Sequence, residues 1–279
     1  MKYLILLLSG LIALATSCSS QKTNYELIAG YQDTTLTFPT LSITDTTRVL
    51  AVFPHADDET IAGGLIAYFS SQGAGVHLLT LCRHDETRTK ELNCSAKALG
   101  ISDVEIAGLI NNSWDDIMKD DIKFWYDETD SIQQIIKRKT ETFRPHIIIT
   151  YDSEIGGYGH PEHLISAIET EKMFNSYNNG SAYRPEYLFQ ITLTDKLEDF
   201  LVANTPNYAP MLKKQNSNGL PAPDAALDIS AFWPQKNEAA QCHASQFKTL
   251  KKFYIIYDKN AAEKHQHAFS HEYYKVIGR

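Results

Sequence analysis

The sequence predicts an α/β fold, a Rossmann-like three-layer sandwich with a mostly parallel central sheet and helices on both faces. From residue 46 onward, short apolar runs rich in β-branched residues alternate with segments of helical spacing. These runs are apolar throughout, as in strands that are buried on both faces of a parallel sheet. No internal repeat or linker divides residues 46–279, so we expect a single domain.

The expected elements follow in order along the chain. Strands are predicted at residues 47–53, 75–81, 104–107, 146–151, 187–192 and 227–229. Helices are predicted at residues 61–71, 87–99, 130–143, 161–174 and 237–253, the second of which stops at Gly100 as a helix C-terminus should. Residues 204–225 are rich in Pro, Asn and Gly and predict a long loop, which is more often a functional flap than filler.

The N-terminus has the pattern of an export signal. Lys2 precedes an apolar run from Leu4 to Leu14, which is short for a membrane span, and small residues then lead to Cys18. A cysteine in this position is typical of a bacterial lipoprotein, which predicts a signal peptide at 1–17, lipid attachment at Cys18 and a polar tether and lead-in over 18–45. We therefore expect an exported protein, anchored to a membrane and facing the periplasm or cell surface. Plain secretion, with Cys18 unmodified, is the alternative.

Charge and cysteine content exclude some functions. The chain has 26 Lys and Arg against 34 Asp and Glu, a net charge of −8, and no basic stripe, which disfavours a nucleic-acid partner. Cys82, Cys94 and Cys242 lack metal-site spacing. We expect three buried thiols, although one bridge is possible in an oxidising compartment.

The segment Pro54-His55-Ala56-Asp57-Asp58-Glu59 follows the first strand directly. In a helical turn, His55 and Asp58 can converge on one ion, whereas Asp57 must point elsewhere. Three adjacent carboxylates repel one another unless a cation or a helix N-terminus offsets their charge. Capping of a helix N-terminus could by itself explain one or two of them.

A second polar segment, Gly156-Gly157-Tyr158-Gly159-His160-Pro161-Glu162-His163, follows the strand that ends at Tyr151. Pro161 suits a first helical turn, and the glycines would allow the backbone to approach a ligand closely. Because ligands collect at the carboxyl ends of parallel strands, His163 is expected to meet the first segment there.

Together, His55, Asp58 and His163 give three N/O ligands and leave a coordination position for water, as in catalytic zinc sites. Zinc would lower the pKa of that water towards ~7 and polarise a carbonyl oxygen. Asp57 would stand beside it as the base, so hydrolysis of an amide or ester is the expected chemistry.

These residues resemble the PIG-L/LmbE family of zinc-dependent N-deacetylases, which includes N-acetylglucosaminyl-phosphatidylinositol deacetylases and the deacetylases of mycothiol and bacillithiol biosynthesis. The similarity rests on the two segments above, on Arg88-Thr-Lys-Glu91-Leu, and on Lys236 with His243-Ala-Ser-Gln246. It runs from about Val49 to Gln246. Two departures occur: Ala56 replaces the family's usual proline, and HPEH replaces HPDH, with Glu162 not an expected ligand.

The resemblance implies a role for each matching residue. His55, Asp58 and His163 would bind Zn²⁺ or another divalent metal, and Asp57 would be the general base. His160 and Tyr158 would stabilise the oxyanion or protonate the leaving amine, with the two tasks undivided. Arg88 would bind substrate hydroxyls or phosphate, unless it only pairs with Glu91 on the helix face. Lys236 to Gln246 is expected to pack the last helix, so His243 is left out of the catalytic set.

The expected activity is removal of an N-acetyl group from an N-acetylglucosamine-type sugar or conjugate at the cell envelope. Trp114, Trp125, Tyr126 and Trp233 could stack on sugar rings, although core packing is the more common use of such residues. A catalytically inactive glycan-binding surface lipoprotein is the alternative. Dinucleotide binding lacks support because no G-x-G-x-x-G follows the first strand. The oligomeric state is not predicted.

Overall fold

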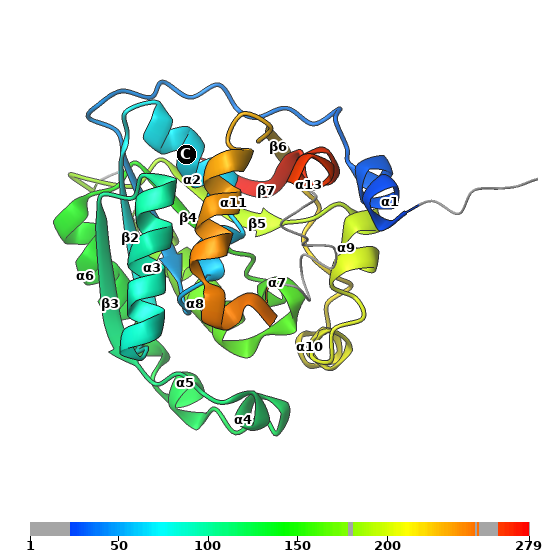
Figure 1. The fold of residues 1–279 in the computed structure, drawn as a ribbon. Coiled ribbons are helices and arrows are strands. Elements are labelled where there is room, and N and C mark those ends of the chain that lie inside the picture. Colours follow the sequence, from blue (N-terminus) through cyan, green and yellow to red (C-terminus); the bar gives the residue numbers. More distant parts are fainter. Residues whose placement is uncertain (1–22, 178–180, 249, 251–261, 279) are drawn as a thin grey trace, which may run out of the picture.

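The computed structural model describes residues 23–177, 181–248, 250 and 262–278. A seven-stranded sheet in the order β3-β2-β1-β4-β5-β7-β6 forms its centre (Figure 1). The strands from β3 to β5 pair in parallel, and β7 pairs antiparallel with both β5 and β6. The predicted Rossmann-like α/β fold with a mostly parallel sheet is therefore confirmed.

All six predicted strands occur, five of them with shifted ends and β5 with the ends predicted, and the described residues contain one additional strand. The strands are β1 (Arg48–Phe53), β2 (Gly75–Cys82), β3 (Asp103–Leu109), β4 (Ile147–Tyr151), β5 (Tyr187–Thr192), β6 (Ala225–Asp228) and the unpredicted β7 (His271–Gly278).

The α-helices are α1 (Asn24–Tyr31), α2 (Gly63–Ser71), α3 (Glu86–Leu99), α4 (Trp114–Met118), α5 (Lys123–Asp127), α6 (Thr129–Phe143), α7 (Gly156–Gly159), α8 (Pro161–Ser176), α9 (Asp195–Leu201), α10 (Tyr208–Gln215), α11 (Trp233–Cys242) and α13 (Ala262–Ala268). Two 3₁₀ turns, η1 (Asp58–Thr60) and η2 (Ala244–Gln246), complete the described elements.

Alternate residues of the buried strands face two separate apolar layers. Val49 and Phe53 of β1 pack in one core with side chains of α2, α3 and α11, whereas Leu50 and Val52 pack in a second core with α6 and α8. Figure 1 shows α2, α3 and α11 in front of the sheet. Since successive residues of a strand point to opposite faces, a strand that is apolar throughout needs a helical layer on each side.

Two predicted elements differ from the structure by more than one or two residues at their ends. Residues 204–225 were expected to form a loop, but α10 lies within them and buries Tyr208 and Met211. Its Pro210 falls in the first helical turn, where a missing N–H is tolerated. The predicted helix over 237–253 instead begins at Trp233 and ends at Cys242, because His243 has non-helical φ and ψ and its side chain points into the protein.

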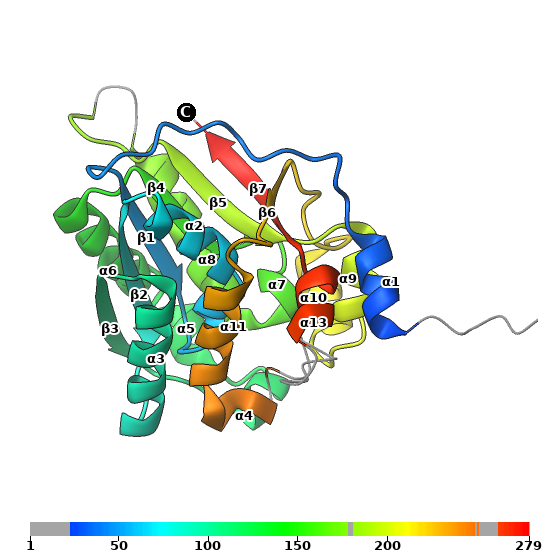
Figure 2. The same cartoon turned by 45° about the horizontal axis from the view of Figure 1, so that its top comes forward.

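The lead-in contains a helix that the sequence pattern does not predict. α1 begins with a capping box between Thr23 and Glu26, and Ile28 is fully buried against α9 and α13. The chain then crosses the top of the molecule to reach β1 (Figure 2). The predicted signal peptide and Cys18 lie outside the described residues. Across the part of the chain that the structure describes, no helix combines the length and apolarity that crossing a membrane requires.

The expectation of three free thiols is wrong. Cys94 on α3 and Cys242 at the end of α11 form a disulfide with a Cα–Cα distance of 5.6 Å, and Cys82 is buried and free. The two cysteines are 148 residues apart, and only the packing of α3 against α11 brings them together. The bridge therefore fastens two helices that cover the same face of the sheet.

Candidate active site

The first polar segment turns sharply at the carboxyl end of β1. Asp57 has φ +128°, outside the regions that non-glycine residues favour, and Asp58 then begins the short 3₁₀ turn η1. Such a conformation costs about 1–3 kcal/mol and persists only where the surroundings enforce it. The turn directs the side chains of His55 and Asp58 toward each other, as expected, and leaves Asp57 facing a cavity.

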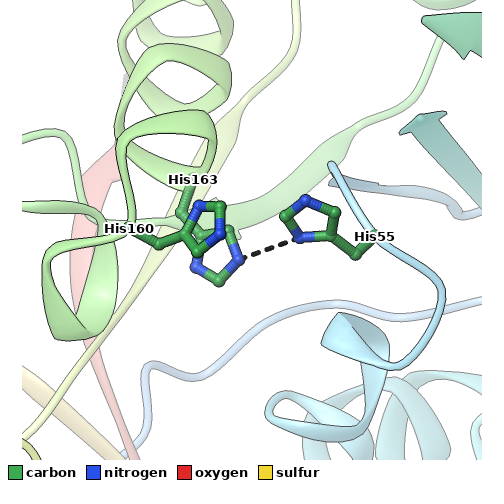
Figure 3. Close-up of side chains that lie close together, drawn as sticks. All are labelled: His55, His160 and His163. Atoms are coloured by element: carbon green, nitrogen blue, oxygen red, sulfur yellow. Dashed lines mark hydrogen bonds between the residues drawn. The ribbon is translucent and has the colours of Figure 1, made fainter. Parts of the chain in front are cut away.

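Three predicted ligands converge from two segments about 100 residues apart. His55 Nδ1 lies 3.1 Å from His163 Nε2 and 3.2 Å from Asp58 Oδ2, and His163 Nε2 lies 3.3 Å from Asp58 Oδ1. Figure 3 shows His55 reaching from the end of β1 toward His160 and His163, which lie at the start of α8. All three predicted ligands are at least nine-tenths buried.

These separations fit a small divalent cation. Ligand atoms at 2.0–2.1 Å from a tetrahedral zinc ion lie ~3.3 Å from one another, close to the spacings between His55, Asp58 and His163. His160 also lies within ligand distance of the two imidazoles. The two imidazoles and one carboxylate could therefore hold a metal with a fourth position toward the cavity.

Glu162, which was not an expected ligand, contacts the other side of His55. Its Oε2 lies 2.5 Å from His55 Nε2, which is hydrogen-bond contact with no room for an ion between the two atoms. Asn112 donates to the other oxygen of Glu162 through its side chain and its backbone N–H. A carboxylate on the far nitrogen of a metal-binding imidazole fixes the ring and its tautomer, so Glu162 orients His55.

Asp57 lies beside the converging ligands. Arg88 Nη2 is 3.3 Å from its Oδ1, and the same guanidinium donates to the carbonyl oxygen of Ala56. Burial and the neighbouring charge of Asp58 raise the pKa of Asp57 to about 7, although Arg88 acts in the opposite direction. A carboxylate with a pKa near neutral is a stronger base than an exposed one, which suits proton abstraction from water.

The second segment is shaped by a buried aspartate at the end of β4. The carboxylate of Asp152 accepts hydrogen bonds from four successive backbone N–H groups, those of residues 154–157. Gly156 and Gly159 have positive φ, and a Cβ there would lie 2.4 Å from Leu164 N and 2.7 Å from Asn207 O. These two glycines therefore admit close packing of the protein's own backbone rather than the approach of a ligand.

His160 presents a neutral imidazole to the cavity. Its Nδ1 accepts a hydrogen bond from the backbone N–H of Glu162 at 3.3 Å, and burial lowers the pKa of His160 well below its usual range. With Nδ1 as acceptor, the ring proton resides on Nε2. His160 can therefore donate one hydrogen bond from Nε2 without carrying a charge.

Tyr158 also borders the cavity, with its ring edge-on to His160 and His163. Burial raises the pKa of the Tyr158 hydroxyl, so it stays protonated at neutral pH and can act as a donor. The structure thus brings both predicted donors to the same side of the converging ligands.

Arg88 does not pair with Glu91, which was the alternative role considered for it. Glu91 instead accepts hydrogen bonds from the backbone and the hydroxyl of Ser245. Arg88 borders the cavity, and its buried Nε has no hydrogen-bond partner among the described residues. The structure therefore places Arg88 at the cavity and in contact with Asp57 rather than with Glu91.

Ala56, where the family usually has proline, makes a backbone hydrogen bond that proline could not make. Its backbone N–H donates to His84 Nε2 at 3.1 Å, a bond that proline could not make. Burial, aided by the positive charge of Arg88, lowers the pKa of His84 to about 4, so the imidazole is neutral and can accept this bond. The alanine therefore loses the rigidity of proline, but its hydrogen bond to His84 stabilises the turn instead.

A cavity of about 340 Å³ opens in front of these groups. The rest of its wall is largely apolar and includes Ile191, Leu193, Leu201, Val202 and Leu220. Trp114, on the exposed α4–α5 segment at the lower edge of Figure 1, also lines the cavity and is 41% exposed. Trp125 and Trp233 are buried in the two cores, so among the three tryptophans only Trp114 can meet a sugar.

Sequence reasoning missed the buried side chains that hydrogen-bond to the two polar segments and fix their conformation, namely Glu59, Asn112, Asp152 and Glu162, and it left out His243. Each is buried or half-buried and bonded to a residue of the two polar segments or to its backbone. The only sequence signal was that several of them lie next to predicted site residues; nothing in the sequence marked their partners.

A parallel sheet with imidazoles and carboxylates converging at its carboxyl edge, beside a further carboxylate and a cavity, is typical of an α/β enzyme that binds a metal and activates water. Residues 50–173 match the family described as GlcNAc-PI de-N-acetylase. This match confirms the predicted resemblance to the PIG-L family, whose members are metal-dependent N-deacetylases, and it confirms the predicted enzyme class.

One relative is the 1D-myo-inositol 2-acetamido-2-deoxy-alpha-D-glucopyranoside deacetylase of Thermobifida fusca, which is 28% identical over 71% of this chain and 83% of its own length. Among solved structures, the N,N'-diacetylchitobiose deacetylase of Pyrococcus horikoshii is similar with a TM-score of 0.53, 15% identity and coverage of 83% and 84% of the two chains.

The 4-carboxy-2-hydroxymuconate hydratase of Pseudomonas putida shares the fold as well, with a TM-score of 0.51, 15% identity and coverage of 84% of this chain and 97% of its own. Because a hydratase and a deacetylase share this architecture, the fold by itself does not specify the reaction.

Proposed function

We propose that this protein is a zinc-dependent hydrolase that removes the N-acetyl group from an N-acetylglucosamine-type sugar or conjugate. The observation that carries the proposal is the convergence of His55 Nδ1, His163 Nε2 and the Asp58 carboxylate beside Asp57, at the wall of an open cavity. The family and the T. fusca relative, named for an acetamido sugar, support this substrate class.

Two imidazole nitrogens and one carboxylate suit zinc, and they also suit other first-row divalent ions. A divalent ion, when bound to His55, Asp58 and His163, supplies a Lewis acid that polarises the amide carbonyl and makes water more acidic. Tyr151 donates to Asp58 Oδ1 at 2.9 Å and Glu162 contacts His55, so two of the three ligands are oriented by further hydrogen bonds.

Asp57 takes the proton as water attacks the acetyl carbonyl. The departing amine needs one proton, and Asp57 returns to it the proton that Asp57 accepted from water. Arg88, in contact with Oδ1, keeps the carboxylate directed at the cavity rather than at Asp58. A general base in this position contributes about 10²–10⁴-fold to the rate.

His160 stabilises the developing oxyanion. Its Nε2 proton is fixed by the bond that Nδ1 accepts from the Glu162 backbone, and an uncharged donor does not compete with a cation for the neighbouring ligands. Tyr158 is the second donor on this side and assists the departing amine. A single oxyanion donor is worth about 10²–10³-fold in kcat.

Arg88 and Trp114 bind the sugar. The Arg88 guanidinium donates to a hydroxyl or phosphate oxygen, and the Trp114 ring offers an apolar face for the pyranose at the cavity mouth. The apolar wall beyond them accepts the non-sugar part of a conjugate.

The test is a screen of the purified, zinc-loaded protein against N-acetylglucosamine, N,N'-diacetylchitobiose and N-acetylglucosaminyl-inositol, with acetate and free amine both quantified. We expect one zinc per chain and one amine per acetate. His55→Ala and Asp58→Ala should lose both zinc and acetate release. Activity retained in the metal-free protein would contradict the proposal. Sugar binding without acetate release would favour the inactive glycan-binding alternative.

We further propose that Cys18 carries lipid and anchors the enzyme to a membrane surface, facing the periplasm or the outside of the cell. The N-terminal sequence pattern supports this proposal. Cells that express the protein and are fed an alkyne palmitate analogue should label the wild type but not Cys18→Ala. Equal labelling of both would contradict it.

A further inference from the structure

The strained turn at Asp57 is held through Glu59. Glu59 has no exposed surface, and its Oε2 accepts the backbone N–H of Asp57 at 3.0 Å. Because Asp57 sits at φ +128°, this bond opposes the tendency of the turn to relax. Relaxation would move the Asp57 carboxylate away from the cavity.

The other oxygen of Glu59 is held by two donors from different helical segments. Ser95 Oγ on α3 lies 2.5 Å from Glu59 Oε1, and His243 Nε2 after α11 lies 2.6 Å from the same atom. All three side chains are fully buried. Neither donor borders the cavity, and the hydrogen bonds of both reach the site through Glu59.

The two donors are the immediate neighbours of the bridged cysteines. Ser95 follows Cys94 and His243 follows Cys242, so the disulfide lies beside the point where both donors reach one carboxylate oxygen. α11 ends at Cys242, and the non-helical His243 turns its ring inward at the position that the bridge fixes. A covalent link here limits how far α3 and α11 can separate around Glu59.

We infer that Ser95, His243 and Glu59 are positioning residues for Asp57, and that the Cys94–Cys242 disulfide keeps the two donors on Glu59. The inference rests on the proposed role of Asp57 as the base. Breaking the bridge or either hydrogen bond lowers kcat and leaves KM and zinc content unchanged, because neither substrate nor metal is contacted.

The first experiment compares paired variants of the full chain. His243→Ala removes the donor, whereas His243→Gln keeps an N–H near the same place; Ser95→Ala and Ser95→Thr form the second pair. We expect kcat to fall about 10-fold or more in each alanine variant and to recover partly in its partner, since small misplacements of catalytic groups are costly. Ser102→Ala removes a hydroxyl that donates to Val76 O far from the site and should leave kcat unchanged.

The second experiment breaks the bridge in the wild-type protein. A water-soluble trialkylphosphine reduces the disulfide to two thiols, takes an oxygen atom from water to become the phosphine oxide, and leaves both protons of that water on the sulfurs. We expect a several-fold loss of kcat at constant zinc content, which reoxidation reverses. The same treatment of a Cys94→Ser/Cys242→Ser variant should change nothing further.

Backbone amide hydrogen exchange of residues 54–66 provides a readout that does not depend on activity. Exchange should become faster in the alanine variants and after reduction. If all of them retain wild-type kcat and exchange, the inference is wrong even though the enzyme works. If the zinc-loaded wild type releases no acetate, the proposed function fails, and hydrogen exchange still tests whether these residues hold the turn. If the His243 variants do not fold, the effect of disulfide reduction on kcat and hydrogen exchange of the wild type tests the inference instead.

Discussion

The parallel part of the sheet, β3-β2-β1-β4-β5, and its antiparallel edge, β7-β6, contribute differently to this enzyme. The segments that follow β1 and β4, including η1 and the first turn of α8, carry His55, Asp57, Asp58 and His163, so the proposed chemistry belongs to the parallel part. From the antiparallel edge, the β7 residues 271–274 line the cavity, and α9 beside it adds the apolar side chain of Leu201. The parallel part thus supplies the proposed reactive groups, and both parts contribute to the cavity wall.

The two parts meet at the N-terminus of α2. Ala62, which precedes the helix, provides no side-chain cap, and Glu272 of β7 instead accepts the backbone N–H groups of Gly64 and Leu65, both at 2.8 Å. Lys236 Nζ lies 2.5 Å from Glu272 Oε1, and both side chains are buried. A strand that the sequence pattern did not reveal thus completes a helix of the parallel part.

The largest expected effect is in the parallel part. Asp57→Asn keeps the size of the side chain and its contact with Arg88 but cannot take a proton. We expect kcat to fall about 10²–10⁴-fold while zinc content stays at the wild-type level. Steady-state kinetics with metal analysis tests this, and Asp85→Asn, a helix cap on α3, serves as the control. Normal turnover by Asp57→Asn would show that the base lies elsewhere.

A change at the antiparallel edge should damage stability rather than chemistry. Glu272→Ala leaves the Lys236 ammonium buried without its carboxylate and the α2 N–H groups without acceptors, so we expect a loss of about 3–5 kcal/mol in unfolding free energy. Urea denaturation measures it. Lys275 lies in the same strand as Glu272 and forms an exposed ion pair with Asp224, so Lys275→Ala should cost about 0–1 kcal/mol of unfolding free energy. Equal effects would contradict the capping role.

A moderate effect is expected where the cavity opens to solvent. Trp114→Ala removes the aromatic face beside His160 and should raise KM about 3- to 10-fold, with a smaller change in kcat. Met118→Ala, on the same helix and 47% exposed but outside the cavity wall, should change neither. A loss confined to kcat would place Trp114 in the chemistry instead of in sugar binding.

The smallest effect is a pH dependence of stability at α9. Burial, reinforced by the charges of Asp152, Asp195 and Asp199, raises the pKa of Glu198 to about 7, and Glu198 accepts hydrogen bonds from Tyr208 and the Leu220 backbone. A raised carboxyl pKa means that the fold favours the protonated form. Its stabilising contribution is therefore present below the usual carboxyl pKa and is lost as pH rises through about 7.

Glu198→Gln should remove this dependence. We expect a Tm roughly 1–3 °C above the wild type at pH 8 and nearly equal to it at pH 5. Glu141→Gln, on the exposed surface of α6, is the control and should follow the wild type at both pH values. An unchanged difference between pH 5 and pH 8 would exclude Glu198 as the titrating group.

The parallel part could be predicted from the sequence because its signals are local. The run from Val49 to Phe53 is apolar at every position and must be buried on both faces, and Gly100 ends α3 with φ +73°. The residues of the two polar segments follow strand ends directly, so their meeting at one edge of the sheet followed from the parallel topology.

What the sequence determined by itself, then, was the alternation of strands and helices in the parallel part, the family resemblance, and the residues expected to meet at the carboxyl edge. These follow from hydrophobic period, turn residues and motif spacing, which are all properties of neighbouring positions. The tertiary structure decided which partners hold those residues. β7 pairs with β5 across 81 to 91 positions, Cys94 bonds to Cys242 across 148, and His243 contacts Glu59 across 184. Such contacts depend on how complete layers pack, and no short-range pattern encodes that.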